Sequence, residues 1–211
     1  MNHAPSSVSS ISSVPTFGVS RVAVIVAVWA SLSVALATSG ALALLPRPVI
    51  PLLIWSPVVA GVIAYRRGGA MRTFVLGLDP RALVLLHVLR VYFGACFLVD
   101  AAAGRLAARF ADIAGPGDIA AGLLALPVVL IAARPSSTAR TLTLAWNVLG
   151  LADILLVFVT AQRMLLIERD TAFLRAFQAL PYAALPTFVV PLILATHLAL
   201  FARLRAPHSA A

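Results

Sequence analysis

The sequence contains few charged residues and no lysine. Charged residues make up 11% of its 211 residues, hydrophobic residues make up 62%, and the mean hydropathy is +1.02. An ordinary soluble domain is about 25% charged and about 45–50% apolar. Such a scarcity of charge excludes an extensive surface in contact with water, and the apolar segments leave too little chain for a separate soluble catalytic domain. Lipid is therefore expected to be the main solvent of the folded chain.

Cysteine and the common catalytic signatures are also scarce. Cys96 is the single cysteine, so it has no partner for an intramolecular disulfide. The sequence has no Gly-x-Ser-x-Gly, no His-Glu-x-x-His, no phosphate-binding glycine loop with lysine and no Cys-x-x-Cys. We therefore favour a protein that is not an enzyme. We also predict no metal site, because the cysteine and the three methionines lie away from the histidines that would be their co-ligands.

All positive side-chain charge at neutral pH comes from 16 arginines. The negative charge comes from six aspartates and one glutamate, so the net charge is +9. The arginines stand in short connections between apolar segments rather than in one basic cluster. This pattern indicates anchoring at a membrane surface and argues against nucleic acid as a partner. The lipid bilayer is the expected partner.

Apolar segments of about 20 residues recur along the chain and predict an all-α, polytopic transmembrane helical bundle of about six spans. The expected spans are 22–45, 48–65, 82–103, 118–133, 141–161 and 180–202. They form a single transmembrane domain over 21–205, between a disordered, serine-rich tail at 1–20 and a C-terminal tail at 206–211.

Several boundaries depend on local signals. We expect the first span to remain uncleaved, because its 24 uncharged residues exceed the 7–15 of a signal peptide. Prolines inside the second and last spans, including Pro57 and Pro191, predict kinks. Gly115-Pro116-Gly117 is expected to break the chain before the fourth span. Residues 162–178 are expected to form a helix at the membrane interface.

Six spans place both termini on one side of the membrane. That side would carry nine arginines and the opposite side six, with most of the acidic residues. The excess favours cytoplasmic termini. The absence of lysine beside abundant alanine and arginine is typical of a high-GC bacterial coding sequence, so we expect a bacterial inner-membrane protein. No internal repeat is evident, which weakens the interpretation as a transporter.

Ionisable and polar residues inside the spans are the strongest functional signal, because a charge at the centre of a membrane helix costs about 2.5–3.5 kcal/mol. Counted from the side of the termini, His87, Asn147 and His197 lie roughly 8–9 Å deep, and Arg90 lies roughly 12 Å deep. Asp153 lies deeper, within reach of the arginine side chain. We predict that Arg90 pairs with Asp153 and that all five residues line a polar bundle interior. Gly94 is expected to permit close helix approach, and Gly150 shares a helix face with Trp146 and Asp153.

The role of these residues stays open at this point. One hypothesis is a homo-oligomeric bundle that binds or translocates a small solute, an anion or a proton. A second is a redox protein in which His87 and His197 bind haem b. A third is a scaffold or accessory subunit in which Arg90 and Asp153 form a structural pair. Asp118, which follows Gly-Pro-Gly, is interpreted as a cap of the fourth helix.

Three stretches carry a resemblance to other proteins. They are Gly117-Asp118-Ile119-Ala120-Ala121-Gly122, Ala145-Trp146-Asn147-Val148-Leu149-Gly150-Leu151-Ala152-Asp153, and Leu185-Pro186-Thr187-Phe188-Val189-Val190-Pro191 followed by His197. They resemble motifs of a family of uncharacterised bacterial multi-span membrane proteins. The resemblance covers the second half of the chain and implies a membrane location. It implies no activity and no role for any residue.

Overall fold

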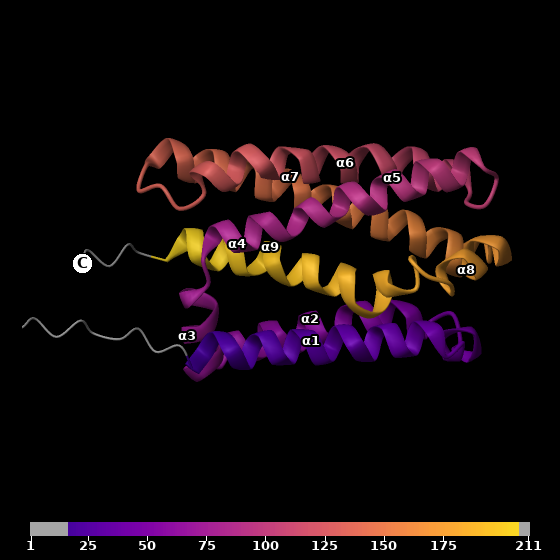
Figure 1. The fold of residues 1–211 in the computed structure, drawn as a ribbon, viewed down its shortest axis with the longest axis horizontal. Coiled ribbons are helices and arrows are strands. Elements are labelled where there is room, and N and C mark those ends of the chain that lie inside the picture. The colour runs from indigo at the N-terminus through magenta and orange to yellow at the C-terminus, as the bar shows by residue number, and fades with distance from the viewer. Residues whose placement is uncertain (1–16, 207–211) are drawn as a thin grey trace, which may run out of the picture.

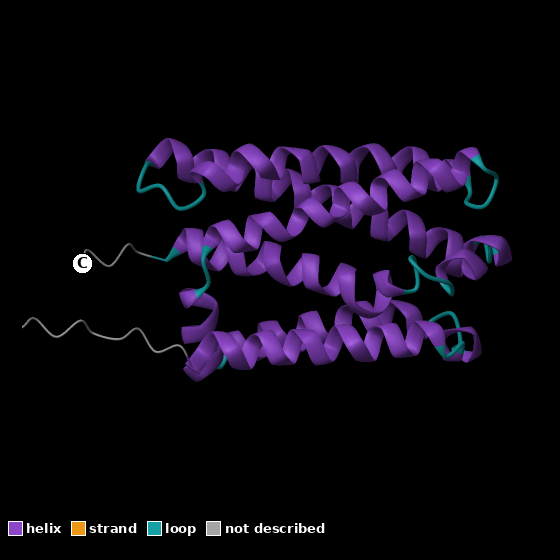
Figure 2. Cartoon of the chain, in the orientation of Figure 1, coloured by secondary structure: helices purple, strands orange, loops and turns teal. Residues whose placement is uncertain are grey.

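The fold is all-helical. The computed structural model describes the backbone of residues 17–206 and the side chains from residue 24 to 206, and these described residues contain no β-strand (Figures 1 and 2). The tails expected at 1–20 and 206–211 fall mostly outside that range. The α-helices are α1 (Phe17–Thr38), α2 (Val49–Arg66), α3 (Gly69–Gly77), α4 (Pro80–Leu85), α5 (Leu89–Ala102), α6 (Ala108–Ile131), α7 (Ser137–Gln162), α8 (Thr171–Phe177) and α9 (Val190–Arg205).

Shorter helical segments link or extend these helices. They are the 3-10 segments η1 (Ala41–Leu44) and η2 (Leu86–Val88), and the π-helical segments η3 (Arg163–Ile167) and η4 (Leu185–Val189). Through η2, the helices α4 and α5 form one span, and η4 runs directly into α9.

Five helical spans are long and apolar enough to cross a membrane. They are Val49–Arg66, Pro80–Ala102, Ala108–Ile131, Ser137–Ile167 and Leu185–Arg205. Many of their large apolar side chains are exposed, which is the arrangement expected of a surface in contact with acyl chains. The described side chains of α1 add a shorter apolar helix, Val24–Thr38. The all-α bundle is therefore confirmed, while the number of six spans stays a prediction.

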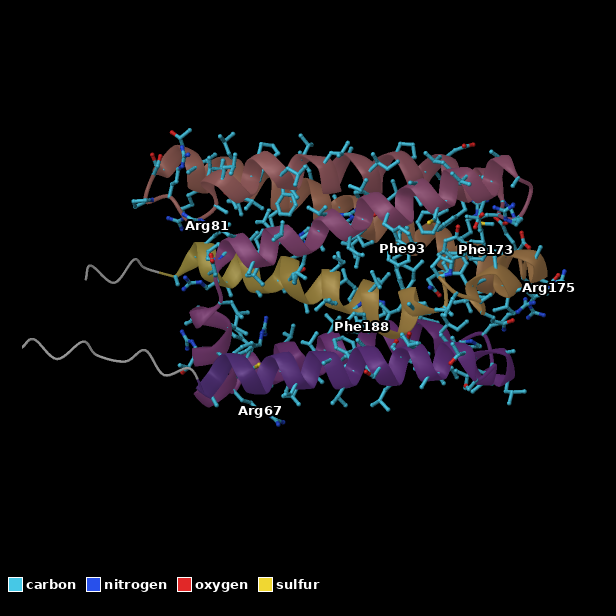
Figure 3. All side chains as sticks on the ribbon, viewed as in Figure 1. Arg67, Arg81, Phe93, Phe173, Arg175 and Phe188 are labelled. Carbon is cyan, nitrogen blue, oxygen red and sulfur yellow. The ribbon has the colours of Figure 1, made fainter. Side chains whose placement is uncertain are left out.

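Successive long helices run in opposite directions, so α1 begins and α9 ends at the same end of the bundle (Figure 1). We call this the arginine-rich end. Figure 3 shows Arg67 and Arg81 there, and Arg175 of α8 at the opposite end. By the element order, the arginine-rich end holds Arg66, Arg67, Arg72, Arg81, Arg134, Arg140, Arg203 and Arg205.

The expected break at Gly115-Pro116-Gly117 is wrong. These residues lie inside α6, which runs through Ala108–Ile131, so the fourth helix begins ten residues earlier than 118. The chain instead turns after α5, where Gly104 has a φ of 69°. Proline removes one backbone hydrogen bond, and packed neighbouring helices tolerate that loss in a membrane span because an open loop would expose many unbonded groups.

Other boundaries shift by smaller amounts. The first helix ends at Thr38, and Gly40 (φ 73°) leads into η1, so the apolar segment 22–45 is not one helix. The segment 162–178 forms η3 and then α8. The side chain of Asp170 caps α8 by accepting hydrogen bonds from the backbone N–H groups of Ala172 at 3.0 Å and Phe173 at 2.9 Å.

A proline in the last span creates the contact that joins α1 to the bundle. Pro191 has no N–H, so the carbonyl four residues earlier, at Thr187, loses its ordinary helical donor. The indole N–H of Trp29 donates to that carbonyl at 2.9 Å, and Ser33 bonds the Thr187 hydroxyl. Trp29 also packs edge-on against Phe188, with ring centres 5.0 Å apart. The backbone remains helical through Pro191, with a π-helical turn before it.

Candidate functional site

Glycines on α5 and α6 allow these two helix backbones to approach each other closely. A Cβ atom added at Gly94 would lie 2.7 Å from the carbonyl oxygen of Gly115, and one added at Gly122 would lie 3.0 Å from that of His87. Gly94 thus permits close approach as predicted, and the helix it faces is α6. The short distance brings the side chain of Arg90 within reach of α6 as well as α7.

Arg90 lies at the centre of a buried ion-pair cluster that joins three helices. Its Nε donates to Oδ1 of Asp118 on α6 at 2.7 Å, and its Nη2 donates to Oδ2 of Asp153 on α7. Its Nη1 donates to the carbonyl oxygen of Gly150 at 3.0 Å. The Arg90 side chain is 2% exposed, that of Asp118 is 6% exposed and that of Asp153 is 21% exposed. The predicted contact between Arg90 and Asp153 is therefore present.

Asp118 is a member of this cluster and not a helix cap. It lies in the middle of α6, whose N-cap position is Ala107, and its carboxylate is buried against Arg90. A helix start at 118 would place Asp118 at the helix end, whereas the actual start at Ala108 places it in the helix interior. Counted from Ala108, Asp118 lies about 15 Å into the bilayer, at the depth of the other charged groups. Gly117 also belongs here, because a Cβ atom at this position would collide with the carboxylate of Asp153.

A second polar group lies between this cluster and the arginine-rich end, and it contains two buried imidazoles. The ring centres of His87 and His197 are 4.3 Å apart, and Trp146 packs against both rings. The rings connect to the cluster through Gly150, since a Cβ atom there would lie 3.0 Å from Cε1 of His197 and 3.5 Å from Nη1 of Arg90. The structure therefore brings together His87, Arg90, Asn147, Asp153 and His197 and adds Asp118.

The hydrogen bonds define which nitrogen of each imidazole carries the proton. Nδ1 of His197 is 2.8 Å from Oδ1 of Asn147, which can only accept, so Nδ1 donates. Nε2 of His87 is 3.1 Å from Oγ1 of Thr196, whose own hydroxyl donates to the Ile193 carbonyl at 2.7 Å. Nε2 of His87 is therefore also a donor. Among the described residues, Nδ1 of His87 and Nε2 of His197 have no hydrogen-bond partner and remain free to accept a proton.

The two histidines do not fit a haem as axial ligands. Ligands on opposite faces of a haem have metal–nitrogen bonds of about 2 Å each, which places their ring centres about 6 Å apart. The observed separation is 4.3 Å, too short for a haem iron to lie between the two rings. Within the described residues, no three His, Cys, Asp or Glu side chains are grouped so that they could hold a metal ion.

An apolar cavity of about 70 Å³ reaches one wall of the cluster from the α8 side of the bundle. Its lining comes from α2, α5, α6, α7, α8 and the start of the last span. Most of the lining is aromatic or aliphatic, and Asp118 is the charged residue within it. A carboxylate that is paired with Arg90 through one oxygen therefore also forms part of the cavity wall.

Comparison with known proteins gives one family. No curated protein and no solved structure matches the chain. A family model matches residues 70–205, which span α3 to α9 and include every residue of the cluster and of the histidine pair. Because that match covers more than half of the sequence, the chain belongs to the family described as Domain of unknown function (DUF8737).

Proposed function

We propose that this chain is an integral membrane protein that takes up and releases a proton at Asp118 and Asp153, and so translocates protons through its bundle. The supporting observation is that two carboxylates share the single guanidinium of Arg90 inside the bundle. With both carboxylates ionised, the cluster carries one uncompensated negative charge. An uncompensated charge is expensive inside a membrane, and a bound proton or cation removes it.

The same charge count disfavours the anion hypothesis. An anion would need a net positive charge, whereas the guanidinium of Arg90 is already paired with two carboxylates and donates a further hydrogen bond to the Gly150 carbonyl. A buried site with one excess negative charge repels a second anion. Proton handling therefore accounts for the residues better than anion handling does.

The histidine pair supplies proton acceptors on the way to the arginine-rich end. We call Asp153, Asp118, Arg90, His197 and His87 together the polar column. Asp153 is its most exposed carboxylate, and the free ring nitrogens of the two histidines continue it beyond Gly150. Neutral imidazoles with a free nitrogen can accept a proton and pass it on. A proton entering near Asp153 would thus find acceptors along the column.

The arginine distribution supports a location in a bacterial inner membrane with the arginine-rich end in the cytoplasm. A bundle of this size would act as a homo-oligomer.

The test is proton flux into vesicles that contain the purified protein and an internal pH-sensitive dye. A potassium diffusion potential, inside negative, should acidify vesicles with the wild-type protein faster than vesicles without protein. We expect Asp118→Asn and Asp153→Asn to abolish the difference. Asp112→Asn is the matched control, because Asp112 is exposed on the same helix α6. Equal flux in all variants, or none above protein-free vesicles, would reject the proposal.

A structural role is the second candidate, and the pairing of Arg90 with protein oxygens on two other helices favours it. In that case the chain is a scaffold or accessory subunit whose cluster holds α5, α6 and α7 in register. Asp118→Asn would then lower the stability of the protein while no vesicle preparation showed flux.

A further inference from the structure

The cavity beside the cluster has the lining of a site for a small ligand. Its volume of about 70 Å³ exceeds the roughly 10–15 Å³ that one water molecule needs, so it admits a compact ligand. Five phenylalanines contribute to its wall, together with aliphatic residues from α2, α7 and the last span. These phenylalanines are Phe97, Phe110, Phe158, Phe173 and Phe177. Such a lining favours a compact ligand with small apolar substituents.

The polar groups of the lining indicate the charge of that ligand. Oδ1 of Asp118 is bonded to Arg90, and no described residue donates a hydrogen bond to Oδ2. Gln162 also lines the cavity, and its Oε1 is buried without a partner among the described residues. Both unpartnered atoms are acceptors. A ligand that complements them must bring a positive charge or hydrogen-bond donors.

We propose that this cavity binds a compact organic cation, a protonated amine or a quaternary onium ion with small apolar substituents, whose charge pairs with Asp118. The cation would neutralise the excess negative charge of the cluster, and the aromatic faces of the wall would attract it further. This inference rests on the proposed function, because proton and cation would compete for the same carboxylate. Exchange of one for the other would couple proton entry to cation exit.

The competing occupant is a neutral apolar molecule such as a lipid acyl chain. It would fill the same cavity by burial of apolar surface alone and would gain nothing from Asp118. The two occupants therefore differ in one respect that can be measured, which is the dependence of binding on that carboxylate.

The experiment measures binding of tetramethylammonium, a compact quaternary cation, to the full-length protein in detergent by titration calorimetry. We expect Asp118→Asn to weaken binding by about 10- to 100-fold, as loss of a charge-assisted contact does. Ala161→Phe should weaken it comparably, because Ala161 lines the cavity and the added ring would fill it without touching Arg90. The matched controls are Asp112→Asn and Ala120→Phe, both at exposed positions on α6, and they should bind as the wild type does.

Proton exchange gives the second readout. Titrations in two buffers of different ionisation enthalpy should show release of protons on binding by the wild type, increasing as the pH is lowered. Binding that is equal in Asp118→Asn and the wild type would overturn the inference in favour of a neutral apolar occupant. Absence of binding would overturn it as well. Proton flux that persists in Ala161→Phe vesicles but is lost in Asp118→Asn would leave the proposed function standing in either case.

Discussion

Replacing Arg90 by methionine tests whether the cluster is the main polar element of the bundle interior. Methionine keeps most of the volume of the arginine stem but removes the guanidinium. Two carboxylates on α6 and α7 would then face each other without a cation, and the Gly150 carbonyl would lose its donor. Helices α5, α6 and α7 would lose the group that bonds all three.

The magnitude follows from burial. Removing one partner of a buried ion pair costs about 3–5 kcal/mol, because the other charge is left uncompensated. Here two charges are left, but Asp153 is 21% exposed and so is less deeply buried than Asp118. We therefore expect Arg90→Met to lower the free energy of unfolding by about 3–5 kcal/mol. The triple variant Arg90→Met, Asp118→Asn, Asp153→Asn removes every charge and should lie within about 1 kcal/mol of the wild type.

The assay is unfolding in mixed micelles with increasing sodium dodecyl sulfate, followed by tryptophan fluorescence. Arg81→Met is the control, because Arg81 is exposed at the start of α4 and its loss should cost less than about 0.5 kcal/mol. Lower pH should reduce the deficit of Arg90→Met, since protonated carboxyl groups need no cation. A triple variant as unstable as Arg90→Met would refute the reasoning, because the loss would then not come from uncompensated charge.

Three further substitutions test the packing around the cluster. Gly94→Ala should lower the free energy of unfolding by about 1–3 kcal/mol, because its Cβ atom meets the backbone of α6, whereas Gly61→Ala meets no atom within 4 Å and should be neutral or stabilising in the same micelle assay. Trp29→Phe removes the indole donor that joins α1 to η4 and should cost about 0.5–1.5 kcal/mol; a loss no larger than that of Trp55→Phe, which makes no indole hydrogen bond among the described residues, would contradict this. Asp170→Ala removes the cap of α8 and should speed backbone hydrogen exchange over 171–177 by the equivalent of about 1 kcal/mol. The N–H of Phe173 and the guanidinium of Arg109 hold the pKa of Asp170 below its ordinary value, so its contribution should be complete above the unfolded pKa of about 3.9 and lost as the pH falls through the lower folded pKa. Exchange in the wild type that did not respond to acid would argue against the cap.

Part of the site follows from the sequence alone, because depth in a membrane helix is a simple count of residues. The contact between Arg90 and Asp153 and the proximity of His87 to His197 could be predicted from matched depth on helices of known direction. Such a count works only where the helix ends are marked, as they are by arginines on both sides of α5 and α7.

The role of Asp118 could not be predicted in this way. Gly115-Pro116-Gly117 is a strong turn signal in water, where solvent satisfies the freed backbone groups. Inside the bilayer the same residues serve close packing, since Gly115 admits Gly94 of α5 and Gly117 leaves space for Asp153. A turn signal that holds in water therefore fails inside the bilayer, and it cannot place the second carboxylate of the cluster.

The cavity extends beyond the part of the chain that matches the family, whereas the polar column lies entirely within it. All the charged groups of the column lie within residues 70–205, the part that matches the family. The cavity takes part of its wall from outside this range, at Ile50 and Ile54 of α2, and Trp55 of the same helix packs on Phe158 with ring centres 5.5 Å apart. A change of side-chain volume at Ile50 or Ile54 would reshape the space open to a ligand and leave the charges around Arg90 unaltered. Selection of the ligand would thus depend in part on α2, which contributes no residue to the polar column.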